Sequence, residues 1–163
     1  MATDIFGGLA TVFAAILGAL IAFVLLQTLG ERLKRRRLKR LSFQALIHEF
    51  DQNQQHQAFS SIISLDDEAY RQFKRRGFLA ELEETFQHDL MHLYSRIHEK
   101  NQLLLYFQSA LSAGKSSSSL LVGGEQTPMP ITVLLEKIKV EIDQKINELL
   151  PRLVDAFEDA MDP

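Results

Sequence analysis

The sequence predicts an all-α protein, with one N-terminal transmembrane helix followed by a cytoplasmic helical bundle or hairpin of three to four helices. Residues 5–29 carry no charged side chain, and apolar residues recur at spacings of three and four after residue 41. Alternating runs of β-branched residues are few and no Asn-Gly or Asp-Gly turn is present, so we expect no strands. We therefore divide the 163 residues into a transmembrane anchor (1–30), a basic juxtamembrane segment (31–40) and an acidic helical domain (41–163) with a flexible loop at 114–130.

The apolar segment is long enough to cross a membrane. A helix rises about 1.5 Å per residue and a bilayer core is about 30 Å thick, so residues 5–29 span it with length left for tilt. A cleaved signal peptide is the alternative. No Lys or Arg precedes the apolar run, which is also longer than the apolar region of a typical signal peptide. These features favour a retained anchor.

Small residues recur every four positions along the apolar segment, at Ala10, Ala14, Gly18 and Ala22. A neighbouring row consists of Gly7, Thr11, Ala15 and Ala19. Small side chains let a second helix approach closely, so the row at Ala10, Ala14, Gly18 and Ala22 is a candidate packing face for a second copy or a partner subunit. The alternative is that the rows only reflect the composition of membrane segments.

Seven basic residues follow the span: Arg32, Lys34, Arg35, Arg36, Arg37, Lys39 and Arg40. By the positive-inside rule they place the N-terminus outside the cell membrane and the C-terminal domain in the cytoplasm. They are also candidates to contact anionic lipid headgroups, a contribution of about 1 kcal/mol per residue near the surface. A role in topology alone is the simpler interpretation.

The charge of the C-terminal domain limits its partners. Residues 41–163 carry 11 basic and 19 acidic residues, a net charge of −8, which disfavours nucleic acid as a partner. The chain has no cysteine, which excludes disulfides and cysteine-based metal or catalytic sites.

Four helical segments are expected after the basic residues. Residues 41–64 have an apolar face of Phe43, Leu46, Ile47 and Phe50, and Ser64–Asp67 offers N-cap side chains for a short helix at 67–76 that ends before Gly77. Residues 78–113 show a nearly heptad seam that is interrupted at Lys100 and Asn101, and that packs within the chain or against a second copy. Residues 131–161 form the last helix, with a kink or local break expected at Pro151.

Motifs for chemistry are weak. Gly114-Lys115-Ser116 matches only the end of a phosphate-binding loop, because Ser109 stands where the first glycine is required. Glu84, His88 and His92 have metal-ligand spacing but are expected on a solvated face. We therefore assign no catalytic, cofactor-binding or metal-binding residue, and expect no enzyme activity, no cofactor and no small-molecule substrate.

Three runs resemble a pattern in an uncharacterised prokaryotic family of single-pass membrane-anchored helical proteins. They are His48–Asn53, Gly77–Leu82 and Tyr94–Asn101. The resemblance implies a helical fold and no particular activity. Within these runs, Asn53 and Asn101 either pair across the bundle and fix its register, or lie exposed.

The expected function is that of a non-enzymatic, membrane-tethered interaction or assembly subunit of a larger membrane complex. Its expected partners are membrane lipid and other transmembrane helices. The alternative is a membrane-anchored signalling or sensing regulator that acts through changes in the packing of its helical bundle.

Overall fold

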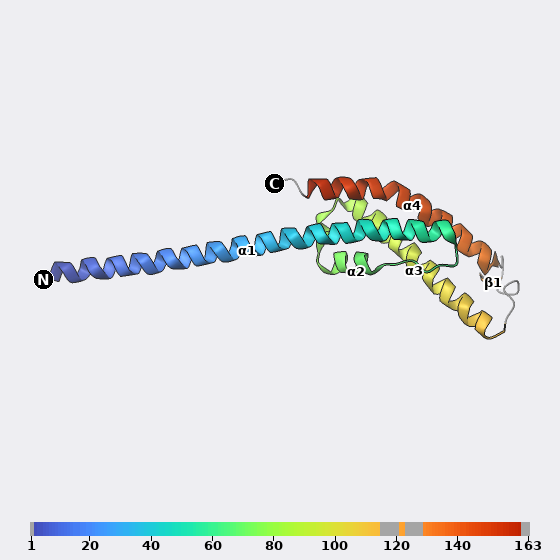
Figure 1. Cartoon of the computed structure of the whole chain (residues 1–163), viewed down its shortest axis with the longest axis horizontal. Coiled ribbons are helices and arrows are strands. Elements are labelled where there is room, and N and C mark those ends of the chain that lie inside the picture. Colours follow the sequence, from blue (N-terminus) through green and yellow to red (C-terminus); the bar gives the residue numbers. More distant parts are fainter. Residues whose placement is uncertain (1, 115–120, 123–128, 161–163) are drawn as a thin grey trace. The chain divides into compact units, whose positions relative to one another are not determined.

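The computed structural model describes residues 2–114, 121–122 and 129–160, with side chains from residue 15 onward apart from those of residues 59, 121 and 122. The described residues form four α-helices, and these are α1 (Ala2–Phe59), α2 (Glu68–Arg75), α3 (Glu84–Ser112) and α4 (Ile131–Asp159) (Figure 1). The chain divides into two compact units, Met1–Lys39 and Arg40–Pro163. The all-α class is confirmed, with one long apolar helix at the N-terminus.

The first unit is the N-terminal part of α1. Side chains from Ala15 to Leu38 are exposed, including the large apolar ones. By length and composition, α1 is the one helix in the described part of the chain that is able to cross a membrane. Membrane insertion and orientation remain predictions.

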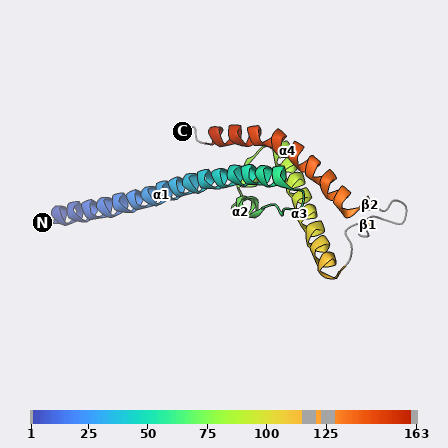
Figure 2. The ribbon, with the colours of Figure 1, turned by 45° about the vertical axis from the view of Figure 1, so that its right-hand side comes forward.

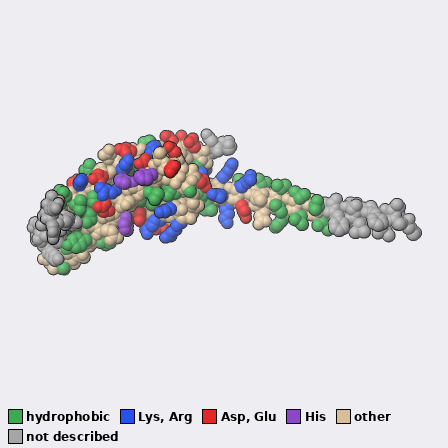
Figure 3. Space-filling model, turned by 180° about the vertical axis from the view of Figure 1, so that it is seen from behind, with side chains coloured by type: hydrophobic (Ala, Val, Ile, Leu, Met, Phe, Trp, Pro, Cys, Tyr) green, Lys and Arg blue, Asp and Glu red, His purple; other side chains and the backbone are tan. Residues whose placement is uncertain are grey.

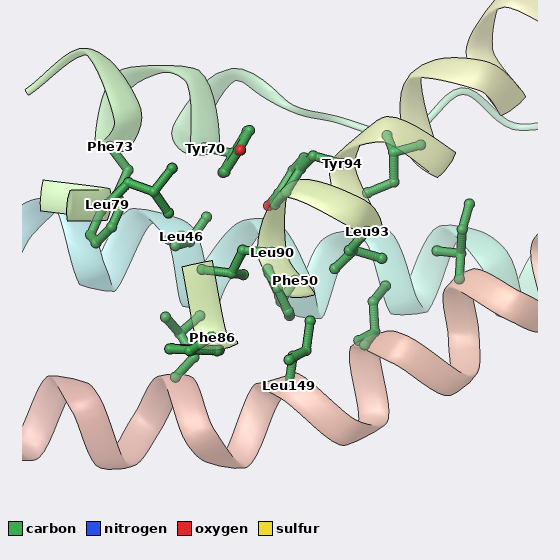
Figure 4. Close-up of a cluster of buried hydrophobic side chains, with 14 of the residues drawn as sticks. Leu46, Phe50, Tyr70, Phe73, Leu79, Phe86, Leu90, Leu93, Tyr94 and Leu149 are labelled. Atoms are coloured by element: carbon green, nitrogen blue, oxygen red, sulfur yellow. The ribbon is translucent and has the colours of Figure 1, made fainter. Parts of the chain in front are cut away.

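The second unit is built around one main hydrophobic core. Phe43, Leu46 and Phe50 of α1 are buried, as the apolar face predicts, while Ile47 is partly buried. Aromatic rings from α2 and α3 complete this core (Figure 4), with the rings of Phe43 and Phe73 packed edge to face at 4.9 Å. Tyr70 of α2 and Tyr94 of α3 stack at 3.9 Å.

The α3 seam is buried within the chain. Its buried apolar residues are Phe86, Leu90, Leu93, Ile97, Leu104 and Phe107. Leu111 follows Phe107 by four residues and is predicted by this spacing to belong to the seam, but it is 43% exposed, and Ala110 is buried in its place. Leu104, Phe107 and Ala110 pack with Ile131 and Leu135 of α4 in a second, smaller cluster.

The single helix predicted over residues 78–113 is wrong at its N-terminal end. Phe78–Glu81 forms a short 3₁₀ helix, η1, and the backbone is extended at Leu82 and Glu83 before α3 begins. Phe78 and Leu79 are adjacent and both buried. Adjacent residues point about 100° apart on a helix, so a turn between η1 and α3 lets both side chains enter the core. Gly77, before which the short helix is predicted to end, has φ 79°, a left-handed conformation that favours glycine after the end of a helix.

The expectation of no strands is also wrong, although the difference is small. β1 (Leu121–Val122) pairs in antiparallel fashion with β2 (Met129–Pro130). Strands of two residues are too short to show an alternating pattern. The predicted flexible loop at 114–130 lies mostly outside the described residues, because 115–120 and 123–128 are not described.

Pro151 lies inside α4, which continues without interruption to Asp159. Figure 2 shows α4 bent along its length. Proline has no N–H to donate to the carbonyl of Asn147, so the helix loses one internal hydrogen bond there and can curve around the core.

Candidate functional site

The structure places the predicted transmembrane packing face only in part. Gly18 and Ala22 are exposed, whereas the side chains of Ala10 and Ala14 lie outside the described residues. A Cβ atom added at Gly18 would meet nothing within 4 Å. Around these positions the large apolar side chains between Ile16 and Leu29 are 48–71% exposed. The described part of this segment therefore presents an uncovered apolar surface that can meet lipid or another helix.

The predicted headgroup-binding residues begin shortly after this apolar surface. Arg32, Lys34, Arg35, Arg36, Arg37 and Arg40 are exposed, and Lys39 is half-buried. Leu33 in the same stretch is also 66% exposed. This arrangement can contact an anionic surface through its long basic side chains.

A second candidate site lies inside the C-terminal unit, where three buried polar residues follow one another at every fourth position of α1. These residues are Glu49, Asn53 and Gln57, which are 4%, 1% and 0% exposed. Residues four apart on a helix lie on one face, so they form a continuous line, which we call the polar row. Each member holds a different segment of the chain.

Glu49 holds the N-terminal end of α2. Its carboxylate accepts hydrogen bonds from the backbone N–H groups of Ala69 at 2.6 Å and Tyr70 at 3.2 Å, and from the Tyr94 hydroxyl at 2.6 Å. Burial raises the pKa of Glu49, while the three hydrogen bonds act in the opposite direction. Burial and the adjacent Glu49 also raise the pKa of Tyr94 well above its ordinary value.

This arrangement corrects the predicted N-cap. Asp67 stands at the N-cap position of α2, but its side chain makes no capping hydrogen bond and instead pairs with Arg71 at 2.7 Å. The carboxylate that satisfies the free N–H groups of α2 comes from Glu49 on α1. A negative charge at this position also interacts favourably with the helix dipole.

Asn53 and Asn101 hold the segment between α1 and α2 from two sides. Asn53 donates to the Asp66 carbonyl and accepts from the Asp66 N–H, both at 2.8 Å. Asn101 likewise donates to the Leu65 carbonyl at 2.8 Å and accepts from the Leu65 N–H at 3.0 Å. The two asparagines therefore neither pair with each other nor lie idle at the surface. They fix the path of a connecting segment whose Leu65 is buried in the core.

Gln57, the last member of the polar row, lies beside Lys100 of α3. Lys100 is 0% exposed and its Nζ donates to Gln57 Oε1 at 3.2 Å. Burial lowers the pKa of Lys100 to about 8, against the opposing effect of Asp143 on α4. In the described part of the chain, Gln57 Nε2 and the neighbouring His56 Nδ1 are buried atoms without a hydrogen-bond partner. Such a cluster is costly to bury, which distinguishes it from the rest of the core.

A pocket lined by residues of α3 and α4 is separate from this cluster. It has a volume of about 200 Å³ and is lined by His92, Leu93, Arg96, Glu141, Ile142, Gln144 and Lys145. Its charges are already engaged, since Arg96 binds Glu141 and Glu99, and Lys145 binds Glu148 at 3.0 Å. Glu84, His88 and His92 are all exposed on α3. Among the described residues, no group of three His, Asp or Glu side chains is placed to hold a metal ion.

No family model matches this chain, and no curated protein or solved structure is significantly similar to it. The resemblance at His48–Asn53, Gly77–Leu82 and Tyr94–Asn101 thus stays a prediction. The structure adds a physical role for its polar members. Glu49 and Tyr94 make hydrogen bonds that connect α1, α2 and α3, while Asn53 and Asn101 bind the segment between α1 and α2.

Proposed function

We propose that this chain is a non-enzymatic, single-pass membrane-tethered interaction subunit, with its N-terminus outside and residues 40–163 in the cytoplasm. The observation that carries the proposal is the exposed apolar surface between Ile16 and Leu29, followed by a basic segment from Arg32 to Arg40 in which only Lys39 is half-buried. An apolar surface of this length is unfavourable in water and favourable in a bilayer. The one-sided basic segment supports the orientation.

Topology is tested with reporters fused after Pro163. A reporter that is active only in the cytoplasm should give a signal, and one that is active only outside the membrane should not. The protein should also stay in the membrane fraction after alkaline carbonate extraction. Release by carbonate would refute the anchor, while an external C-terminus would refute the orientation and the contact of the basic segment with the inner leaflet.

Assembly within the membrane is the second part of the proposal. Lipid tails are as apolar as leucine, so helices associate in a bilayer mainly through close packing at small residues. Gly18→Leu adds bulk where a Cβ atom has open space in the isolated chain, so it should block a partner without disturbing the chain itself. Leu17→Ile is the matched control. Association of the span, measured in a two-hybrid assay for membrane segments, should fall for Gly18→Leu only, and equal association would leave the segment as a plain anchor.

The cytoplasmic unit offers exposed apolar side chains for partner contact. Six large apolar side chains on α3 and α4 are 43–61% exposed: Met91, Leu105, Tyr106, Leu111, Val133 and Val140. Purification in mild detergent should therefore recover stoichiometric partners. A monodisperse protein that copurifies with nothing would contradict the subunit proposal.

One observation favours the alternative of a sensing regulator. The cluster of Gln57 and Lys100 buries a titratable amine that donates to an uncharged amide oxygen, at the place where α1, α3 and α4 meet. A group of this kind makes the packing of a bundle sensitive to its surroundings. The regulator would show a change in bundle packing on addition of a stimulus to the purified protein, whereas the subunit would not.

A further inference from the structure

The C-terminal end of α2 carries a small basic surface. Lys74 and Arg75 occupy the last turn of α2 and Arg76 follows it, and all three side chains are exposed. Arg71, one turn earlier, is engaged by Asp67 at 2.7 Å and Glu68 at 3.2 Å. The positive charge of α2 is therefore concentrated at its C-terminal end, where the helix dipole also favours cations.

Hydrogen bonds fix where this basic end lies in the C-terminal unit. The N-terminal end of α2 is bound by Glu49, whereas Arg76 Nη1 donates to Ser42 Oγ at 2.7 Å. Because Ser42 precedes Glu49, α2 runs antiparallel to this part of α1. The basic end therefore lies at the end of the unit where its chain begins, because Ser42 is the third residue of the unit.

Acidic side chains occupy the other side of α1 at the same end. Phe157 of α4 lies 6.2 Å from the ring of Phe43, and Asp155, Glu158 and Asp159 surround it in sequence. In Figures 1 and 2, α1 runs between α2 and α4. Figure 3 keeps the vertical axis of Figure 1, and it shows acidic side chains along the upper edge formed by α4 and basic ones at the lower edge near α2. This end of the unit is therefore polarised in charge.

We propose that the basic surface of Lys74, Arg75 and Arg76 is a second contact with anionic lipid headgroups. It would hold the α2 side of the unit against the leaflet and turn the acidic α4 side toward the cytoplasm. This inference rests on the proposed membrane anchor, which keeps the unit close to the surface. Each basic residue near an anionic membrane strengthens the contact about fivefold, and the acids on the α4 side disfavour the opposite orientation.

The chain has no cysteine, so single labels can be placed without removing native ones. Gln72→Cys puts a fluorophore on the exposed surface of α2, one turn before the basic end, and Ser95→Cys puts one on an exposed position of α3 as the control. The full chain is reconstituted into vesicles of phosphatidylcholine, with or without phosphatidylserine, that contain a headgroup-attached quencher. The Gln72→Cys probe should be quenched more in anionic vesicles than in neutral ones, and the Ser95→Cys probe equally in both.

Adding Lys74→Gln and Arg75→Gln should return the quenching of the α2 probe to its level in neutral vesicles, since losing two charges weakens the contact about thirtyfold. High salt should act in the same direction. Equal quenching in both lipids, or no effect of the double substitution, would overturn the α2 contact. Carbonate extraction of the same vesicles tests the anchor separately. A chain that is extracted, but whose α2 probe is still quenched only with phosphatidylserine, would refute the anchor and keep the α2 surface.

Discussion

Replacing the buried Lys100 with methionine should stabilise the C-terminal unit. Lys100 is 0% exposed and has Gln57 Oε1 as its hydrogen-bond acceptor at 3.2 Å. From α4, the carboxylates of Asp143 and Glu136 favour its charged form and Lys139 opposes it. Burial outweighs these charges, and the pKa of Lys100 falls from 10.5 to about 8.

The size of the effect follows from this change in pKa. When the pKa of a group differs by one between the folded and unfolded states, the difference corresponds to about 1.4 kcal/mol of stability. The fall from 10.5 to about 8 makes burial of the charged amine cost about 3 kcal/mol at neutral pH. Lys100→Met removes that cost and keeps an unbranched apolar chain, but it leaves the Gln57 amide without its donor, a loss of about 1 kcal/mol. We expect a net gain of about 2 kcal/mol.

The pH dependence of the stability difference between Lys100→Met and wild type gives a sharper test than the size of that difference alone. The folded-state pKa is the lower one, so the unfolded chain binds more protons between about pH 8 and 10.5. Stability of the wild type therefore rises with pH across that window, and the penalty is complete below it. The advantage of Lys100→Met should be greatest at neutral pH and should shrink as the pH rises through the window.

Urea unfolding of the full chain in detergent micelles measures both quantities. The Tyr70 and Tyr94 rings, stacked at 3.9 Å, report loss of tertiary packing in near-UV circular dichroism. Lys137→Met, at an exposed position of α4, is the matched control and should change little. A Lys100→Met protein less stable than wild type, or one with an unchanged pH dependence, would show that the fold stabilises the charged amine of Lys100 and would refute the burial cost.

Two further predictions concern the hydrogen bonds that hold the loop and α2 in place. Glu49→Ala should lower the free energy of unfolding by about 3 kcal/mol and Glu49→Gln by less, because alanine leaves the α2 N–H groups and the Tyr94 hydroxyl without an acceptor. Hydrogen exchange of the Ala69 and Tyr70 amides measures the effect, and unchanged protection would refute the capping role. Asn53→Ala and Asn101→Ala should each lower the free energy of unfolding by about 2 kcal/mol. Hydrogen exchange should become faster at the Asp66 amide in the first variant and at the Leu65 amide in the second. Faster exchange at both amides in either variant would mean that the whole segment opens together.

Much of the fold follows from apolar spacing. The 3.6-residue period of Phe43, Leu46 and Phe50, and of the residues along α3 and α4, identifies the faces that are buried. The η1 turn could not be predicted in this way, because Leu79 and Leu82 continue the helical spacing of Phe86 and so conceal the turn in the sequence. The ladder between β1 and β2 depends on a pairing of two residues per strand, which leaves no pattern in the sequence.

The polar interior was partly visible in the sequence. The interruption of the α3 seam at Lys100 and Asn101 marks the positions where a buried cation and a loop-binding amide replace apolar packing. The four-residue spacing of Glu49, Asn53 and Gln57 was a usable signal too. What spacing cannot supply is burial, since the same polar residues on a solvated face would look identical until α2 and α3 are placed against them.

The polar row also connects the interior of the unit to its basic surface. With eight residues, α2 is shorter than the about 12–15 residues that an isolated helix needs to be even marginally stable, so its position depends on what α1 and α3 provide. Tyr70 and Phe73 bury its apolar face, and Glu49 fixes its N-terminal end. Once that end is fixed, the direction of the helix determines where Lys74 and Arg75 lie. Glu49 is thus a positioning residue for the proposed lipid contact, and Glu49→Ala should weaken quenching of the α2 probe in anionic vesicles although it removes no basic charge.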